Sequence, residues 1–299
     1  MNLMCKFLGM EFRNPIVLAS GIAKYGREFD DEIGLENVGG IITKTISREP
    51  RKGNPHPRIA ETDCGIMNSI GLANPGIESF LGNELPYLES HRTNIIVSIA
   101  GEKTGDLVHM AKSIGEVNYV DAIELNLSCP NVDTGMRFCH VPDDTFNAVS
   151  EVREVISKPL VAKLSPNAPD IVKIARSAME GGADALSLVN TLAGIKVDPI
   201  KRKFVLGNVT GGLSGPAIRP VGLRMVYEVK KELDIPVIAH GGIVDHLSAL
   251  EYFLLGADLI AVGSGLFKNP DLVGDIRTGL QNYLEEKNLS LDEIRGGLL

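Results

Sequence analysis

Eight short runs of apolar, often β-branched residues recur along this 299-residue chain, and their spacing is the feature that most limits its fold. Each run is almost continuously apolar, which is typical of parallel strands covered on both faces. Amphipathic, helix-like segments separate the runs, so strands and helices alternate along the chain. We predict strands at Ile16–Ala19, Gly40–Thr45, Ile95–Ile99, Ala122–Leu127, Leu160–Leu164, Ala185–Val189, Val237–Ala239 and Leu259–Val262.

Two of the intervening helices have recognisable start signals, because Asp170 and Asp245 are each placed to cap a helix. We expect the inward-facing residues to be Ile171, Ile174, Ala175 and Ala178 in the first helix and Leu247, Leu250 and Leu254 in the second. Both regions repeat the order strand, helix, Gly-Ala-Asp and strand at an offset of roughly 75 residues, about two units of a (β/α)8 barrel. We therefore predict that residues 1–299 form a single (β/α)8 TIM barrel domain. The alternative is an open doubly wound sheet, which lacks support because no GxGxxG turn follows the first strand.

The charge balance excludes several classes of partner. There are 30 Lys and Arg residues against 38 Asp and Glu, a net charge of −8, which disfavours nucleic acid and anionic membrane surfaces. No apolar run approaches the roughly 20 residues of a membrane span, and the N-terminus lacks a signal-peptide pattern, so we expect a cytoplasmic protein. The four cysteines form no CxxC pair and match no zinc or iron–sulfur spacing, so we expect free thiols and no metal site.

Polar residues gather where the predicted strands end. In a closed barrel these ends converge on one mouth, and two long loops, 47–76 and 194–220, belong at the same face. Lysines, amides, a thiol and hydroxyls gathered there would suit an anionic ligand that forms many hydrogen bonds. The residues are Ser20, Lys44, Thr45, Ser98, Asn126, Ser128, Cys129, Lys163, Asn190, Thr191, Gly241, Gly242, Gly263 and Ser264.

Each of these candidates also has a purely structural interpretation. The glycines after the last two strands (241–242 and 263–264) favour the phosphate site of such barrels, although they also suit simple tight turns. Lys163 would either contact a ligand or bury its aliphatic chain and place its ammonium group in solvent at the barrel rim. Cys129 follows a strand between two asparagines, where it would be either a loop thiol acting on a substrate or a small core residue. His240 suits a ligand contact and a buried structural imidazole equally well.

With these residues laid out, the sequence resembles the dihydroorotate dehydrogenase family over nearly its whole length. The motifs that carry the resemblance are Asn14-Pro-Ile-Val-Leu-Ala-Ser-Gly21, Met67-Asn-Ser-Ile-Gly-Leu72, Glu124-Leu-Asn-Leu-Ser-Cys-Pro-Asn131, Val161-Ala-Lys-Leu-Ser-Pro166, Val189-Asn-Thr191 and Gly211-Gly-Leu-Ser-Gly-Pro216. The resemblance implies a (β/α)8 barrel with FMN at its C-terminal mouth, and oxidation of dihydroorotate to orotate in pyrimidine (UMP) biosynthesis.

The family divides by its catalytic base, and Cys129 resembles the soluble class, which uses cysteine where the membrane-associated class uses serine. Segments 58–62, 67–68 and 203–208 are similar to the NAD-linked type. That type passes electrons from FMN to NAD through a partner subunit carrying FAD and a [2Fe–2S] cluster. The resemblance thus implies a homodimer of catalytic chains within a heterotetramer, with the second pair of cofactors on the partner.

The resemblance also implies the residues of the site. Cys129 would be the catalytic base. The FMN contacts would be Ser20, Lys44, Thr45, Ser98, Asn126, Lys163, Val189, Gly215, Gly241, Gly242, Gly263 and Ser264. The substrate contacts would be Lys44, Asn68, Ser69, Ile70, Gly71, Leu72, Asn126, Asn190 and Thr191.

Three other functions stay open on the sequence. A fumarate-linked dihydroorotate dehydrogenase would need no partner subunit, and a dihydropyrimidine dehydrogenase subunit would share the barrel and an active cysteine. A lyase or synthase of phosphate-bearing ligands would use Lys44 or Lys163 as a Schiff-base lysine and would be colourless.

Overall fold

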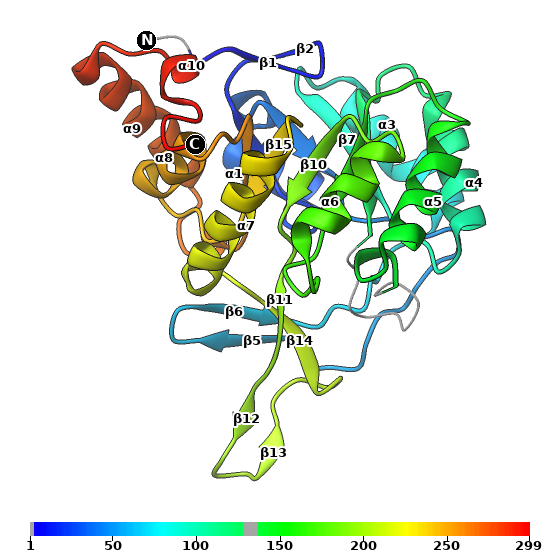
Figure 1. The fold of residues 1–299 in the computed structure, drawn as a ribbon. Coiled ribbons are helices and arrows are strands. Elements are labelled where there is room, and N and C mark those ends of the chain that lie inside the picture. The colour runs from blue at the N-terminus through cyan, green and yellow to red at the C-terminus, as the bar shows by residue number, and fades with distance from the viewer. Residues whose placement is uncertain (1–2, 128–136) are drawn as a thin grey trace.

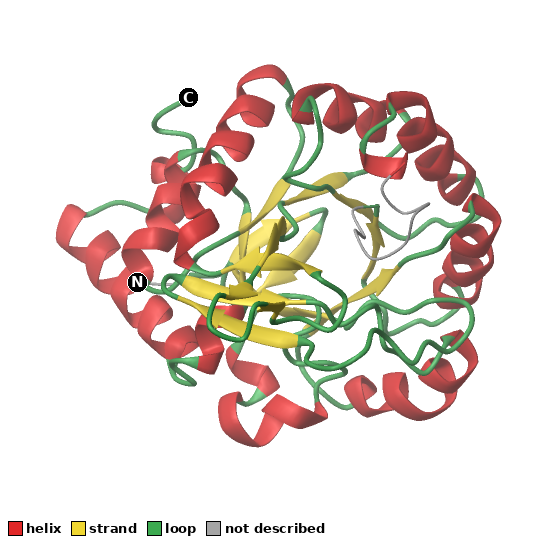
Figure 2. Cartoon of the chain, turned by 90° about the horizontal axis from the view of Figure 1, so that it is seen from below, coloured by secondary structure: helices red, strands yellow, loops and turns green. Residues whose placement is uncertain are grey.

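The predicted barrel is present. The computed structural model describes residues 3–127 and 137–299, in which eight parallel strands close into a ring with helices outside it (Figures 1 and 2). In order around the ring, the strands are β3 (Ile16–Leu18), β4 (Gly40–Ile42), β7 (Asn94–Ile99), β8 (Ala122–Asn126), β9 (Leu160–Lys163), β10 (Ala185–Leu188), β15 (Val237–His240) and β16 (Leu259–Val262). All eight apolar runs are thus confirmed as barrel strands, and the doubly wound alternative is excluded.

Helices follow the strands and cover the outside of the barrel. They are α1 (Arg27–Ile33), α2 (Ile77–Ser79), α3 (Leu85–Glu89), α4 (Thr104–Gly115), α5 (Pro142–Arg153), α6 (Ile171–Glu180), α7 (Arg219–Glu232), α8 (His246–Leu254), α9 (Leu272–Lys287) and α10 (Leu291–Ile294), with a π-helical stretch at Phe80–Glu84. Short 3-10 turns lie at Leu35–Asn37, Arg137–Cys139, Pro216–Ile218 and Ser264–Phe267. None of these helices, within the part of the chain described, is long and apolar enough to cross a membrane.

The capping residues act as expected, with one error in the predicted faces. The Asp170 carboxylate accepts from the Lys173 amide at 3.1 Å, and α6 buries the four predicted residues. Asp245 caps α8 and Leu250 is buried as predicted, but Leu254 is only half-buried, and Leu247 is 58% exposed and was wrongly placed inward. The buried face of α8 is centred instead on residues 249–253, so position 247 falls on the opposite side of the helix.

An N-terminal hairpin closes the amino-terminal end of the barrel (top of Figure 1). It consists of β1 (Cys5–Phe7) and β2 (Met10–Phe12), and the Phe7 and Phe12 rings meet edge to face at 6.0 Å. These rings pack against an apolar layer inside the barrel that includes Val17, Ile42 and Val161. The amino-terminal half of the barrel is therefore solid core, and the carboxyl-terminal end is available for a site.

The two long loops form one structure at that opposite end. The first contributes β5 (Ile59–Thr62) and β6 (Gly65–Asn68), and the second contributes β11 (Leu192–Ile195) and β14 (Thr210–Ser214). The strands pair antiparallel in the order β11-β14-β6-β5, below the barrel in Figure 1 and across its mouth in Figure 2. A small hairpin, β12 (Val197–Asp198) with β13 (Lys203–Phe204), projects beyond this sheet. The sequence placed both loops at this face but did not reveal that they pair.

Candidate active site

Two adjoining cavities lie between the barrel mouth and the four-stranded sheet, and they share Ser20, Asn68, Lys163 and Asn190 in their walls. Most of the predicted ligand-binding residues line them, although they come from distant parts of the chain. These are Ser20, Lys44, Thr45, Asn68, Ile70, Leu72, Asn126, Lys163, Val189, Asn190, Thr191, Gly215, Gly241, Gly242, Gly263 and Ser264. The predicted convergence on one mouth is therefore present.

Three predicted contact residues lie behind the cavity wall. Ser98 is fully buried in β7, where its hydroxyl contacts other side chains. Ser69 is also fully buried and accepts a hydrogen bond from Asn54, and Gly71 faces a separate depression that includes Asn54. Cys129, the predicted catalytic base, lies outside the described residues.

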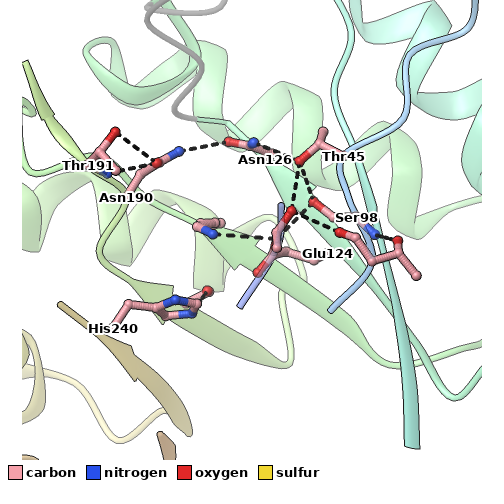
Figure 3. Close-up of polar contacts among 11 residues, drawn as sticks. Thr45, Ser98, Glu124, Asn126, Asn190, Thr191 and His240 are labelled. Carbon is pink, nitrogen blue, oxygen red and sulfur yellow. Dashed lines mark hydrogen bonds and ion pairs between the residues drawn. The ribbon is translucent and has the colours of Figure 1, made fainter. Parts of the chain in front are cut away.

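A chain of hydrogen bonds orients the amides of the mouth (Figure 3). Asn190 accepts from the Thr191 amide at 2.7 Å and donates to the Asn126 side-chain oxygen at 3.3 Å. Asn126 in turn donates to the Thr45 hydroxyl at 3.1 Å, and Thr45 contacts Ser98 at 3.0 Å. These hydrogen bonds fix the orientation of the two side-chain amides. The remaining donor and acceptor atoms of Asn126 and Asn190 therefore have defined positions.

The chain of hydrogen bonds ends on Glu124, which belongs to the motif at residues 124–131 but was not a predicted site residue. Ser98 donates its one hydroxyl proton to Glu124 Oε1 at 2.9 Å. In the hydrogen bond between Thr45 and Ser98, Thr45 is therefore the donor. Lys163 Nζ lies 4.0 Å from the same carboxylate oxygen. Glu124 is completely buried and Lys163 is 6% exposed, so these opposite charges form a pair inside the barrel.

His240 occupies another part of the barrel interior, away from Glu124 in Figure 3. Its Nε2 atom is 2.7 Å from the Ser187 hydroxyl, a second residue that the sequence did not single out. Burial, followed by the positive charge of Lys163, holds the pKa of His240 well below its usual range. The imidazole is therefore neutral. The signal for Ser187 and Glu124 was present in the sequence, because both are polar residues within otherwise apolar strands.

Lys44 lies at the rim between the cavity and α1. Burial, and next the nearby Lys24 ammonium, lower the pKa of Lys44. Lys24 itself pairs with Glu28 at 2.9 Å. Among the residues that the structure describes, no carboxylate pairs with Lys44 as closely as Glu28 pairs with Lys24, and an anionic ligand would supply such a partner.

The glycine turns after β15 and β16 have the properties of an anion site. Gly241 and Gly242 have φ values of 120° and 68°, which favour glycine, and a Cβ at 242 would lie 2.8 Å from the Gly215 carbonyl oxygen. Within the described chain, the amides of Gly242 and Ser264 donate no hydrogen bond. Bare amides beside Gly263, where a Cβ would meet nothing closer than 3.7 Å, suit a phosphate group.

The other cysteines lie on separate elements. Cys5 is in β1 at the closed end of the barrel, Cys64 is exposed in the turn between β5 and β6, and Cys139 is buried. Cys5 and Cys64 are free thiols. Burial raises the pKa of Cys5 to about 11, so this thiol is unreactive at neutral pH.

The fold and the cavity place the chain among (β/α)8-barrel enzymes whose active site lies at the carboxyl-terminal mouth. The family model for dihydroorotate dehydrogenase matches residues 2–284. The chain belongs to the dihydroorotate dehydrogenase family, as its motifs predicted.

Several relatives are similar over their full length. The catalytic subunit of dihydroorotate dehydrogenase B (NAD(+)) from Alkaliphilus metalliredigens is 45% identical over 299 residues, which cover 99% of each chain. The subunit of the same name from Petrotoga mobilis is 46% identical over 290 residues, 96% of each chain. That from Thermoanaerobacter pseudethanolicus is 44% identical over 300 residues, 100% of this chain and 99% of the relative.

Proposed function

We propose that this chain is the FMN-bearing catalytic subunit of an NAD-linked dihydroorotate dehydrogenase, which oxidises dihydroorotate to orotate in pyrimidine synthesis. The observation that carries the proposal is the pair of adjoining cavities that brings two lysines and three asparagines together with a pair of glycine turns. The relatives named as NAD(+)-type catalytic subunits support it over the fumarate-linked and dihydropyrimidine alternatives.

The residues present suit FMN. The turns at 241–242 and 263–264 would hold its phosphate through backbone amides. Lys163, at the floor of the cavity, would face the flavin ring and stabilise negative charge there. When bound, FMN accepts the hydride that leaves the substrate.

The other cavity residues suit dihydroorotate, a carboxylate with several amide groups. Lys44 would pair with the carboxylate, and Asn68, Asn126 and Asn190 would bind the ring amides. Oxidation removes a proton and a hydride from adjacent ring carbons, and Cys129 would take the proton.

The purified protein provides the test. We expect visible flavin absorbance, and loss of the oxidised-flavin band when dihydroorotate is added without oxygen. A colourless protein, or a flavin that dihydrouracil reduces and dihydroorotate does not, would contradict the proposal.

A separate variant tests the role of Cys129 as the catalytic base. Replacing Cys129 with Ala should leave FMN bound but slow flavin reduction by roughly 10²–10⁴-fold, because the base is lost. Stopped-flow absorbance measures the rate, with Cys64→Ala as the matched control because Cys64 is exposed outside the cavities. Near-normal reduction by the Cys129 variant would exclude it as the base.

A further inference from the structure

One buried charged residue of the barrel, Glu124, is neither a predicted cofactor contact nor a predicted substrate contact. Glu124 has no exposed surface, and a carboxylate is costly to remove from water unless it is paired. It lies in the ladder opposite Ser98 of β7, and Asn126, two residues further along β8, lies opposite Lys163 of β9. Glu124 is therefore directly beneath the floor of the cavity.

The contacts of Glu124 are incomplete in a specific way. Its Oε1 atom accepts from Ser98 at 2.9 Å, and its Oε2 atom has no hydrogen-bond partner among the described residues. Lys163 Nζ is 4.0 Å away, which is too long for a charge-assisted hydrogen bond. The Glu124 carboxylate thus balances the charge of the Lys163 ammonium without accepting a hydrogen bond from it. The N–H groups of Lys163 stay available to the cavity that Lys163 lines.

His240 is a further titratable group close to Lys163. His240 lines the same cavity and is neutral, because burial and the Lys163 charge lower its pKa. The charge at the floor is therefore the sum of Lys163 and Glu124, which is close to zero. An unbalanced Lys163 would favour added negative charge in the cavity much more strongly.

We propose that Glu124 is a positioning residue that balances the Lys163 ammonium and thereby lowers the reduction potential of the flavin bound above it. This inference rests on the proposed function, since it needs FMN in the cavity. Hydride addition brings a negative charge to the flavin, and Glu124 opposes that charge while Lys163 favours it. A lower potential makes the reduced flavin a stronger electron donor.

The test is the midpoint potential of the FMN-loaded protein, measured by dye-equilibrated spectral titration. Glu124→Gln keeps the side-chain volume and an oxygen for Ser98 but removes the charge. We expect a more positive potential, with reduced FMN favoured over oxidised FMN by roughly tenfold more than in the unaltered protein, or about 30 mV for a two-electron couple. Lys163→Gln should shift the potential in the opposite direction, because it leaves the carboxylate unbalanced.

Glu151→Gln is the matched control, since it removes the same charge from an exposed position on α5 and should leave the potential unchanged. If Glu124→Gln does not retain FMN, the variant lacking both charges is compared with Lys163→Gln alone, and it should have the more positive potential. An unchanged or more negative potential in either comparison overturns the inference. Failure of the unaltered protein to bind FMN would instead overturn the proposed function.

Discussion

Lys44 and Lys163 both face the cavity, but they differ in how their charges are balanced. Lys163 has the buried Glu124 carboxylate beside it, whereas Lys44 has Lys24 close enough to lower its pKa. Lys163 is therefore suited to a permanent cofactor, because its charge is already compensated. Lys44 is suited to an anion that binds and dissociates in each catalytic cycle.

The lowered pKa of Lys44 gives a pH prediction. Protonated Lys44 would hold the orotate carboxylate, so affinity should be full at neutral pH and fall as the pH rises through the lowered pKa. The fall should begin below the usual lysine range, which is near pH 10.4. Orotate titrations of the flavin spectrum at several pH values measure it.

Two variants make this assignment specific. Lys44→Arg should remove the alkaline decline, because guanidinium stays protonated. Lys24→Met should move the onset to higher pH, because it removes a charge that lowers the Lys44 pKa. An orotate affinity that is independent of pH in the unaltered protein would contradict a role for Lys44 in binding the carboxylate.

At the scale of elements, α8 supports the proposed phosphate turn from behind. The buried Tyr252 hydroxyl faces the carbonyl oxygens of Gly241 at 2.7 Å and His240 at 3.1 Å, and donates to them. Gly222 on α7 leaves room for this hydroxyl, because a Cβ there would overlap it. With its carbonyls held inward, the turn directs its amides toward the cavity.

Tyr252→Phe should therefore weaken binding of FMN by roughly fivefold, since a hydrogen bond is worth about 1 kcal/mol. Riboflavin, which lacks the phosphate, should bind the variant and the unaltered protein equally well. Fluorescence titration of apoprotein with the two flavins measures both affinities. Equal losses for both flavins would indicate a general packing defect and contradict the role of Tyr252 in the phosphate turn.

The four-stranded sheet positions residues of the proposed substrate site through close backbone contact. A Cβ at Gly212 in β14 would overlap the Thr191 hydroxyl, whereas a Cβ at Gly194 in β11 would meet only the Met67 methyl, at 3.4 Å. Both glycines lie in the same pair of strands. Gly212 is thus required for the position of Thr191, and Gly194 is not.

Gly212→Ala should raise the KM for dihydroorotate by about tenfold, with a small effect on FMN content, because it displaces a substrate contact. Gly194→Ala is the control and should leave both quantities unchanged. Steady-state kinetics and the flavin-to-protein ratio provide the measurements. A normal KM in Gly212→Ala would show that Thr191 does not contact the substrate.

Local sequence patterns predicted elements better than they predicted contacts between elements. The strands were recognisable because each apolar run is complete within three to six residues. The pairing of β6 with β14 joins Asn68 to Gly212, and no local pattern encodes a contact across that separation. Leu247 was misplaced because three leucines at helical spacing outweighed the smaller Ala249 that sets the buried face.

The candidate site was predictable to the same extent. Residues at strand ends, such as Lys163 and Asn126, were found because barrel geometry places them at the mouth. Glu124 was missed as a site residue because it lies inside a strand, where its partners belong to neighbouring strands. Ser98, a predicted flavin contact, is fully buried, contacts Thr45 and donates to Glu124, and neither of these contacts was predictable from its position in the sequence.

At the scale of the whole molecule, the electron path should extend beyond this chain. The relatives are named as catalytic subunits of an NAD(+)-linked enzyme, and Cys5, Cys64 and Cys139 lie on separate elements. We expect the purified chain to reduce its flavin with dihydroorotate but to form NADH only when an electron-transfer subunit is added.

Absorbance at 340 nm, with and without the co-expressed partner, tests this requirement. A parallel assay with fumarate as the acceptor separates the two types of enzyme in the family. Efficient NADH formation by the chain alone, or rapid turnover with fumarate, would contradict the NAD-linked assignment with a partner subunit.

The hairpin that closes the amino-terminal end of the barrel has a consequence for turnover. Because Phe7 and Phe12, with the apolar layer they pack against, close that end, the described residues leave the barrel interior open only at its carboxyl-terminal mouth. A product must therefore depart by the route along which the next substrate arrives. Orotate must leave the cavity before the next dihydroorotate can enter, so product and substrate compete for the same space.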